Sequence, residues 1–301
     1  MVTPVERSPT VRRRRLAKQL AELREQAGLP VKDVAKQLEW AESTVYRMES
    51  ARRGVKPGDV LLLLDLFTRT GNVVITAEQR DEMLRLAREA RKRGWWQTYT
   101  GAVPEPFVVY IGLEAEVATL RVYASELVPG LLQTEQYARA VRRASPSLDQ
   151  EQTDRWVELR MARQRRLRDD DPVRLWTVLN EGVLRRTVGG RAVMADQLAW
   201  LVEAAALPNV TLQVLPFSTG AHPAIEAPFM ILGFPERSDP DVVYVEHLSQ
   251  ALYLETSPDV DGYVLAFDHL RARALDPDES VARVASILQD LRGKQEGGAG
   301  R

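Results

Sequence analysis

The sequence predicts an α+β protein in which an N-terminal all-α bundle is joined to a C-terminal mixed α/β domain with a mostly antiparallel sheet. Up to about residue 93, apolar residues recur at the spacings that amphipathic helices require. From Pro172 onward the period changes, and short runs of β-branched and aromatic residues are bounded by Pro, Gly, Asn or Asp. Short loops join the later runs, which favours antiparallel pairing within a mixed sheet.

Length and charge divide the chain at the same place. A chain of 301 residues is expected to form about two domains. We predict a first domain over residues 11–93, an aromatic linker over 94–106 and a second domain over 107–293. Residues 1–94 contain 20 Lys and Arg against 13 Asp and Glu, a net charge of +7, so the remainder carries −8. A basic module joined to an acidic one is expected when only the first meets phosphate.

The composition argues against several classes of protein. The chain has no Cys, so it has no disulfide framework and no thiolate metal site, and we expect a cytoplasmic protein. No apolar run is long enough to span a membrane. Neither a phosphate-cradling glycine motif nor a nucleophile elbow occurs, and the His residues lack partners at metal-ligand spacing. The sequence therefore predicts no cofactor, no metal and no catalytic site.

Residues 29–50 carry the strongest local pattern, two short helices separated by a tight turn. The apolar faces of the two helices consist of five residues: Val34, Ala35, Leu38, Val45 and Met48. The small side chain of Ala35 allows the helices to approach closely where they cross. Such a turn often contains glycine where this chain has Glu39, and a non-glycine residue at positive φ is strained.

This pattern resembles the repressor-type helix-turn-helix of the XRE family, which includes the lambda repressor and Cro. In that module the second helix lies in the major groove with its N-terminal side chains at base edges. The resemblance implies a DNA-binding set of nine residues: Lys32, Glu42, Ser43, Thr44, Tyr46, Arg47, Arg52, Arg53 and Lys56. Arg47 is suited to reading guanine, and the cations of the following loop are suited to holding phosphates. The alternative is two packed helices with no nucleic-acid role.

The helices expected around this motif span residues 11–27, 57–67 and 76–93. Gly28 is positioned as the C-cap of the first helix, and Thr76 and Gln79 form a capping box at the start of the last. Four consecutive arginines, at positions 12–15, either contact phosphate beside the groove or form a solvated run.

In the second domain, a long charged helix is expected over residues 148–168. Trp156, Leu159 and Leu167 lie on one stripe of this helix, and arginines are dense on the opposite side. Because acidic residues are interleaved with the arginines, a solvated face is favoured over a second anion-binding surface.

A ligand pocket is expected beside the loop over residues 217–223, which follows a strand end. Arg191 and His222 are its candidate polar contacts. Gly189 and Gly190, just before Arg191, form either an anion-binding nest or a turn between helices.

Several phrases of the second domain resemble one family: LVPGLLQTEQYARAV, LPNVTLQVLPFSTGAH, PFMILGFPE and VVYVEHLSQALYLE. That family is the C-terminal domain, of unassigned activity, that follows a repressor-type helix-turn-helix in many actinobacterial regulators and is described as WhiJ-like or antitoxin-like. The resemblance implies a sequence-specific transcriptional regulator whose second domain senses an effector or binds a small partner protein encoded by a neighbouring gene.

The expected partners are therefore a double-stranded DNA operator and a second copy of the chain, because single helix-turn-helix units read short half-sites. Two alternatives stay open from the sequence. One is an antitoxin-like protein whose main role is to bind and neutralise a small partner protein. The other is an enzyme carried on a DNA-binding domain.

Overall fold

The computed structural model describes residues 9–70, 73–91, 95–99, 105–144, 149–236, 239–247 and 250–296. The chain forms two compact units, residues 1–97 and 98–301, which are described separately. Of the expected linker, residues 94 and 100–104 lie outside the described residues, while Trp95–Tyr99 form the 3-10 helix η1. No helix among the described residues is long and apolar enough to cross a membrane.

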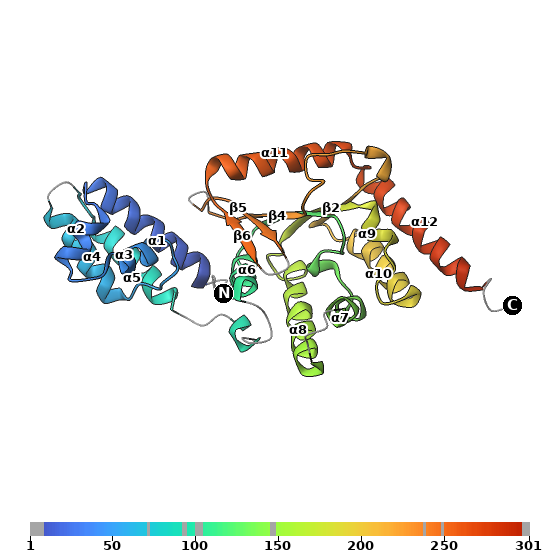
Figure 1. Cartoon of the computed structure of the whole chain (residues 1–301), viewed down its shortest axis with the longest axis horizontal. Helices are drawn as coiled ribbons and strands as arrows, with labels where there is room; N and C mark the ends of the chain where they lie inside the picture. The colour runs from blue at the N-terminus through green and yellow to red at the C-terminus, as the bar shows by residue number, and fades with distance from the viewer. Residues whose placement is uncertain are drawn as a thin grey trace. The chain divides into compact units, whose positions relative to one another are not determined.

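The first unit is a bundle of helices (Figure 1). Its elements are α1 (Pro9–Gln26), α2 (Val31–Gln37), α3 (Glu42–Glu49), α4 (Pro57–Arg69) and α5 (Ala77–Glu89). Every helix contributes to a single core, which includes Leu16, Leu20, Val34, Val45, Met48, Leu64, Phe67 and Leu86. The expected all-α architecture of this part of the chain is confirmed.

The capping signals of this unit act as the sequence predicts. The Thr76 hydroxyl accepts a hydrogen bond from the Gln79 backbone N–H at 3.2 Å, and the Gln79 side chain accepts one from the Thr76 N–H at 3.0 Å. This reciprocal pair satisfies two backbone donors at the start of α5. Gly28, at φ 68°, ends the turn after α1.

The second unit is built on a six-stranded mixed sheet with the order β3-β2-β1-β4-β5-β6. The strands are β1 (Thr119–Ala124), β2 (Arg174–Asn180), β3 (Val210–Leu215), β4 (Phe229–Gly233), β5 (Val242–Glu246) and β6 (Ala251–Leu254). β1, β2 and β3 are parallel to one another, whereas β4, β5 and β6 are each added antiparallel. The expected mixed, mostly antiparallel sheet is confirmed.

Connection length explains where the sheet changes direction. Parallel strands need long crossovers, and these are supplied by α7 (Glu135–Arg143) and α8 (Gln150–Arg163) before β2, and by α9 (Glu181–Arg185) and α10 (Arg191–Ala204) before β3. From β4 onward the loops are short, and the strands pair antiparallel.

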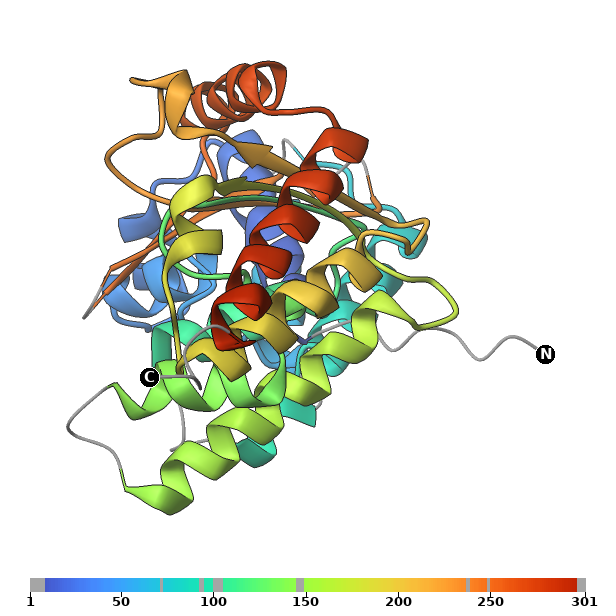
Figure 2. The ribbon, with the colours of Figure 1, turned by 90° about the vertical axis from the view of Figure 1, so that its right-hand side faces the viewer.

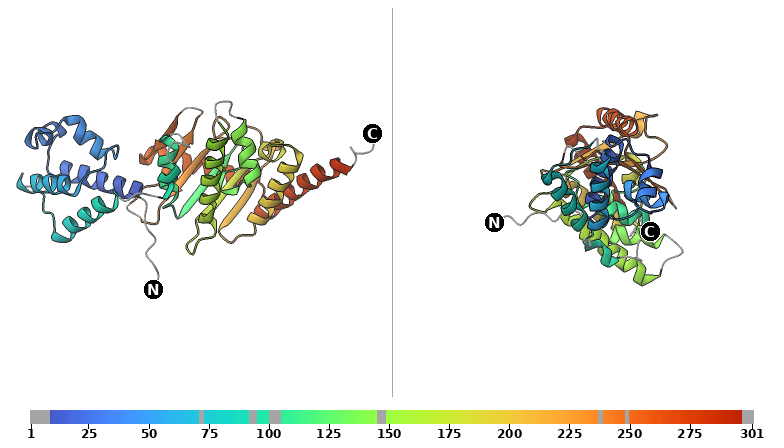
Figure 3. Two further views of the ribbon diagram at one scale, coloured as in Figure 1. Left: turned by 90° about the horizontal axis from the view of Figure 1, so that it is seen from below. Right: turned by 90° about the vertical axis from the view of Figure 1, so that its left-hand side faces the viewer.

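Helices cover both faces of this sheet. Figure 3 (left) shows α6 (Glu105–Glu114), α8, α10 and α12 (Pro277–Glu296) along one face. Figure 2 shows α11 (Ser257–Arg273) on the opposite face. The core beneath α11 includes Tyr123, Val178, Leu215, Phe229, Ile231, Val243 and Phe267. The segment between α11 and α12 and the first turn of α12 cover the outer edge of β3. The Leu275 N–H donates to the Val214 carbonyl, and the Val214 N–H donates to the Ser280 hydroxyl, both at 2.9 Å.

The arginines of the long helix expected over residues 148–168 fall into two groups. Arg165 and Arg168, opposite the Trp156 stripe, are exposed as the solvated face predicts, whereas Arg160 and Arg163 lie on the side of Trp156. Leu148 lies outside the described residues, and the helix comprises α8 and the 3-10 helix η3 (Gln164–Leu167). Arg163 is only 4% exposed and forms two hydrogen bonds with the Glu114 carboxylate, at 2.7 and 2.6 Å. The Arg160 guanidinium lies 3.9 Å from the centre of the Trp156 ring. Interleaved charge along one helix does not reveal a carboxylate that a different helix supplies.

Candidate nucleic-acid interface

Helices α2 and α3 pack through the apolar residues that the sequence identifies. Val34, Ala35, Val45 and Met48 are each no more than 2% exposed, and Leu38 packs against them. With these side chains in the core, Glu42, Ser43, Tyr46 and Arg47 are left exposed on the other side of α3. The alternating burial along α3 therefore defines an outer face that carries no part of the core.

A left-handed residue closes the turn between α2 and α3. Glu39 has φ 55°, as the sequence predicts from its position in the motif. The Trp40 N–H donates to the Ala35 carbonyl at 2.8 Å, and the Glu39 N–H donates to the Lys36 carbonyl at 3.4 Å. This is the Schellman pattern, which satisfies carbonyls at the end of α2 and turns the chain sharply into α3. Glu39 holds a conformation that glycine adopts without strain.

The outer face of α3 begins at its N-terminus. Glu42, Ser43 and Arg47 are exposed, Thr44 is half-buried and Tyr46 is 59% exposed. The Arg47 Nε donates to the Ser43 carbonyl at 3.0 Å, so its guanidinium lies along the helix one turn from the N-terminus. We define this set, residues 42–44 together with 46 and 47, as the α3 outer face. It offers a carboxylate, hydroxyls, a phenol and a guanidinium within two helical turns.

Exposed cations flank the α3 outer face. Arg52, Arg53 and Lys56 lie between α3 and α4, and Lys32 lies in the first turn of α2. An Arg53 guanidinium nitrogen is 3.5 Å from the Thr44 hydroxyl, which brings this loop over the N-terminal part of α3. A second left-handed residue, Ala51 at φ 56°, produces the turn that returns the loop toward the helix.

Other charged groups of this unit pair with one another. Glu49 at the end of α3 accepts the Arg24 Nε at 2.7 Å, and this hydrogen bond raises the pKa of Arg24. Arg12, one of the four consecutive arginines, is 3.0 Å from a Glu89 carboxylate oxygen and only 11% exposed. Arg12 therefore ties α1 to α5 rather than forming a solvated run.

The two candidate ligand residues of the second unit lie on different segments. Arg191 begins α10, directly after Gly189 and Gly190, whose φ angles are 70° and 91°. His222 lies after the short 3-10 helix η4 (Phe217–Thr219), and its Nε2 is 3.2 Å from the Tyr123 hydroxyl. Burial and the neighbouring Arg273 charge lower the pKa of His222.

Two family matches cover both units. A helix-turn-helix domain matches residues 15–74, which include α2, α3 and the cationic loop after them. A domain of unknown function, DUF5753, matches residues 107–286, more than half of the chain. The chain belongs to the DUF5753 family. No curated protein and no solved structure matches this chain. The DUF5753 domain is thus joined to a helix-turn-helix domain of the kind that DNA-binding regulators carry.

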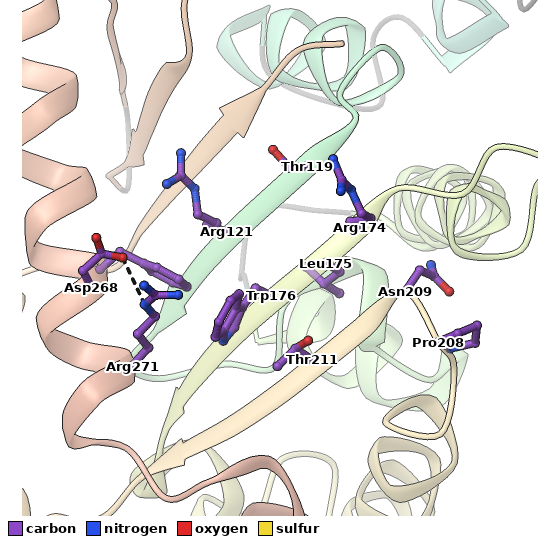
Figure 4. Close-up of a pocket in the computed structure, with 11 residues that line it drawn as sticks. Thr119, Arg121, Arg174, Leu175, Trp176, Pro208, Asn209, Thr211, Asp268 and Arg271 are labelled. Carbon is purple, nitrogen blue, oxygen red and sulfur yellow. Dashed lines mark ion pairs between the residues drawn. The ribbon is translucent and has the colours of Figure 1, made fainter.

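The DUF5753 domain also contains a pocket that the sequence does not reveal. It has a volume of about 550 Å³ and lies against β1, β2, β3 and α11 (Figure 4). Its lining includes Thr119, Arg121, Arg174, Trp176, Thr211 and Arg271. Within the sequence of β2, RLWTVLN, alternation shows that Arg174 and Trp176 share one face of the strand. It does not show that a helix leaves this face uncovered.

Proposed function

We propose that this protein is a sequence-specific DNA-binding transcriptional regulator that reads bases with the α3 outer face. The observation that carries the proposal is the division of α3 into two sides. Val45 and Met48 are buried, whereas Glu42, Ser43, Tyr46 and Arg47 are exposed. The cationic loop after α3 reaches back to this side of the helix through Arg53 and Thr44. A helix of this kind fits the major groove with its N-terminal residues at base edges.

The proposed roles follow from donor and acceptor chemistry. Arg47 presents a fork of N–H donors that suits the two acceptors of guanine, and Glu42 can accept from the cytosine amino group. Ser43 and Thr44 supply hydroxyls to bases or phosphate, and Tyr46 supplies an exposed ring and a hydroxyl. Four cations would hold the duplex through its phosphates: Lys32, Arg52, Arg53 and Lys56.

Arg47→Ala tests the base-reading role. Operator fragments are selected from genomic DNA with the purified full-length protein, and binding is then measured by fluorescence anisotropy at fixed salt. We expect a loss of about 1–3 kcal/mol, roughly 5- to 150-fold, together with relaxed preference at one base position. Arg88→Ala is the matched control, because Arg88 is an exposed residue of α5 and the substitution removes the same charge from the same unit. Equal operator affinity for Arg47→Ala and wild type would refute this role of α3.

Salt dependence tests the phosphate role separately. Replacing Arg52 and Arg53 by Gln should weaken binding to every duplex by a similar factor. It should also reduce the slope of log K against log salt by about one for each phosphate that the variant no longer neutralises. A slope unchanged from wild type would show that the loop after α3 does not meet the duplex.

We further propose that the protein binds its operator as a homodimer and that the DUF5753 domain senses an effector or binds a small partner protein. The dimer rests on the short half-site that one helix-turn-helix can read. Light scattering of the protein on a selected operator should give two chains per duplex. One chain per duplex would contradict the dimer while leaving the role of α3 intact. Co-purification with the product of a neighbouring gene tests the partner, which should remain bound when Arg47 is replaced.

A further inference from the structure

The pocket of the DUF5753 domain lies over the amino ends of the three parallel strands. The strand register aligns Arg121 of β1 with Trp176 of β2 and Thr211 of β3, so these side chains form one row across the sheet. Thr119 and Arg174 are also aligned and lie two residues earlier on their strands. Because residues two apart share a face, both rows project from the same side of the sheet. Figure 4 shows both rows on one face of the sheet, with Arg271 of α11 beside Trp176 and Asp268 of the same helix next to Arg271.

The same face is apolar further along the strands. Two residues beyond Arg121 and Trp176 lie Tyr123 and Val178, and both belong to the core under α11. The change from core to polar residues therefore occurs along single strands, between positions that differ by one pleat. α11 covers the apolar rows and leaves the polar rows open, and the opening is the pocket.

The indole of Trp176 is held in position at the base of this opening. Its Nε1–H donates to the Gln213 side-chain oxygen at 2.8 Å. The Gln213 amide in turn donates to the carbonyls of Arg271 and Leu275, at 3.2 and 2.9 Å. The Phe267 ring also packs against the indole in a T-shaped arrangement, with centroids 6.3 Å apart. A ring fixed in this way can accept a flat ligand without first losing rotamer freedom.

Positive charge dominates the lining. Arg121 pairs with Asp241 at 2.6 Å, and Arg271 pairs with Asp268 at 3.1 Å while its guanidinium lies 4.8 Å from the centre of the Trp176 ring. Arg174 is exposed and forms no ion pair with the residues that the structure describes. The pocket therefore combines two ion-paired arginines with Arg174, which has no ion pair within the described part of the chain, beside the Thr119 and Thr211 hydroxyls.

We propose that this pocket binds a small organic anion with a carboxylate beside a flat apolar group. The flat group packs on Trp176 near Arg271, and the carboxylate binds Arg174, whose planar fork of donors matches two carboxylate oxygens. A volume of about 550 Å³ suits a small molecule of this class. This assignment deepens the effector role proposed above by specifying where the ligand binds and what its chemistry is.

Ligand-observed NMR and calorimetry on the full-length protein test the assignment without DNA. The probes are indole-3-carboxylate and 2-naphthoate, each compared with its neutral carboxamide and with inorganic phosphate. We expect both acids to bind at millimolar concentration or below, and the amides and phosphate at least tenfold more weakly. Arg174→Gln should reduce the affinity for both acids at least tenfold. Trp176→Leu should abolish the preference of the pocket for the two flat acids over inorganic phosphate. The matched control is Arg165→Gln, which removes one exposed arginine of the same domain outside this pocket.

Several outcomes would overturn the assignment. They are the absence of acid binding, equal binding of acids and amides, equal binding of phosphate, or equal acid binding by Arg174→Gln and wild type. Hydrogen exchange of β1 and β2 in each variant shows whether the domain is still folded, so a binding loss is read only in a folded protein. Because no DNA is present, these outcomes leave the proposed role of α3 untouched. Failure of operator binding in turn leaves the pocket assignment untouched.

Discussion

The buried ion pair between Arg163 and Glu114 offers a stringent test of the energetics of the DUF5753 domain. The two side chains are 4% and 2% exposed, and the guanidinium meets both carboxylate oxygens at 2.7 and 2.6 Å. The Tyr110 hydroxyl donates to the same carboxylate at 2.7 Å. Burial disfavours the charge on Arg163, but the Glu114 carboxylate more than offsets this effect and raises the pKa of Arg163.

Arg163→Met should therefore leave a buried carboxylate whose remaining partner among the described hydrogen bonds is Tyr110. Removing one member of a buried pair costs about 3–5 kcal/mol, because the other charge stays uncompensated. Arg160, which is electrostatically coupled to Glu114, can offset part of this loss and favours the lower end of the range. With a urea slope of about 2 kcal/mol/M, the midpoint of unfolding should fall by roughly 1.5–2.5 M.

The double variant Arg163→Met, Glu114→Leu separates charge from packing. Removing both charges deletes the uncompensated group, so the double variant should be clearly more stable than Arg163→Met alone. Hydrogen exchange in urea, followed in peptides of β1 and β2, measures the free energy of unfolding of the second unit in the full-length protein separately from that of the helix-turn-helix. A loss below about 1 kcal/mol for Arg163→Met, or additive losses in the double variant, would refute the argument.

Three further predictions concern local features. Glu39→Gly should stabilise the first unit by about 0.5–1 kcal/mol in denaturant unfolding, because glycine adopts the left-handed φ of 55° without strain; a loss of stability would contradict this. Thr76→Ala removes the cap of α5 and should cost about 1 kcal/mol, seen as a lower Tm of that unit, whereas an unchanged Tm would show that the cap is dispensable. Because the pKa of His222 is lowered in the folded protein, the unfolded chain binds more protons than the folded chain just below pH 6.5. The free energy of unfolding should therefore be unaffected by His222 above that pH and should decrease as the pH falls below it. His222→Gln should flatten the pH dependence of unfolding in that window, and an identical pH profile would exclude His222 as its source.

The helix-turn-helix could be predicted because its determinants are local. The spacing of Val34, Ala35, Val45 and Met48 defines two amphipathic helices within 22 residues, and the same side chains are buried in the fold. The strained turn at Glu39 was also predictable, because its position in the motif requires a left-handed residue. The strands from β2 onward follow from period and composition, as does the antiparallel pairing from β4 onward.

The residues that form the pocket could not be found in this way. Arg121, Trp176, Thr211 and Arg271 are far apart in the chain, and only the parallel register of β1, β2 and β3 brings the first three into one row. Parallel pairing requires crossovers through α7 to α10. The strand order that results depends on how these helices pack on the sheet, so it cannot be predicted from any single segment of the sequence.

By itself the sequence determined the periodic elements: the helices of the first unit, the short strands after Pro172 in the second, and the residues that α3 turns outward. Those features depend on interactions within one or two helical turns, or on alternation along one strand, so a short window of residues contains all their causes. The tertiary structure alone decided which distant charges meet. Arg163 reads as a surface residue until α6 brings Glu114 against it, because the free energy of a buried charge depends on the group opposite and not on its neighbours in the chain.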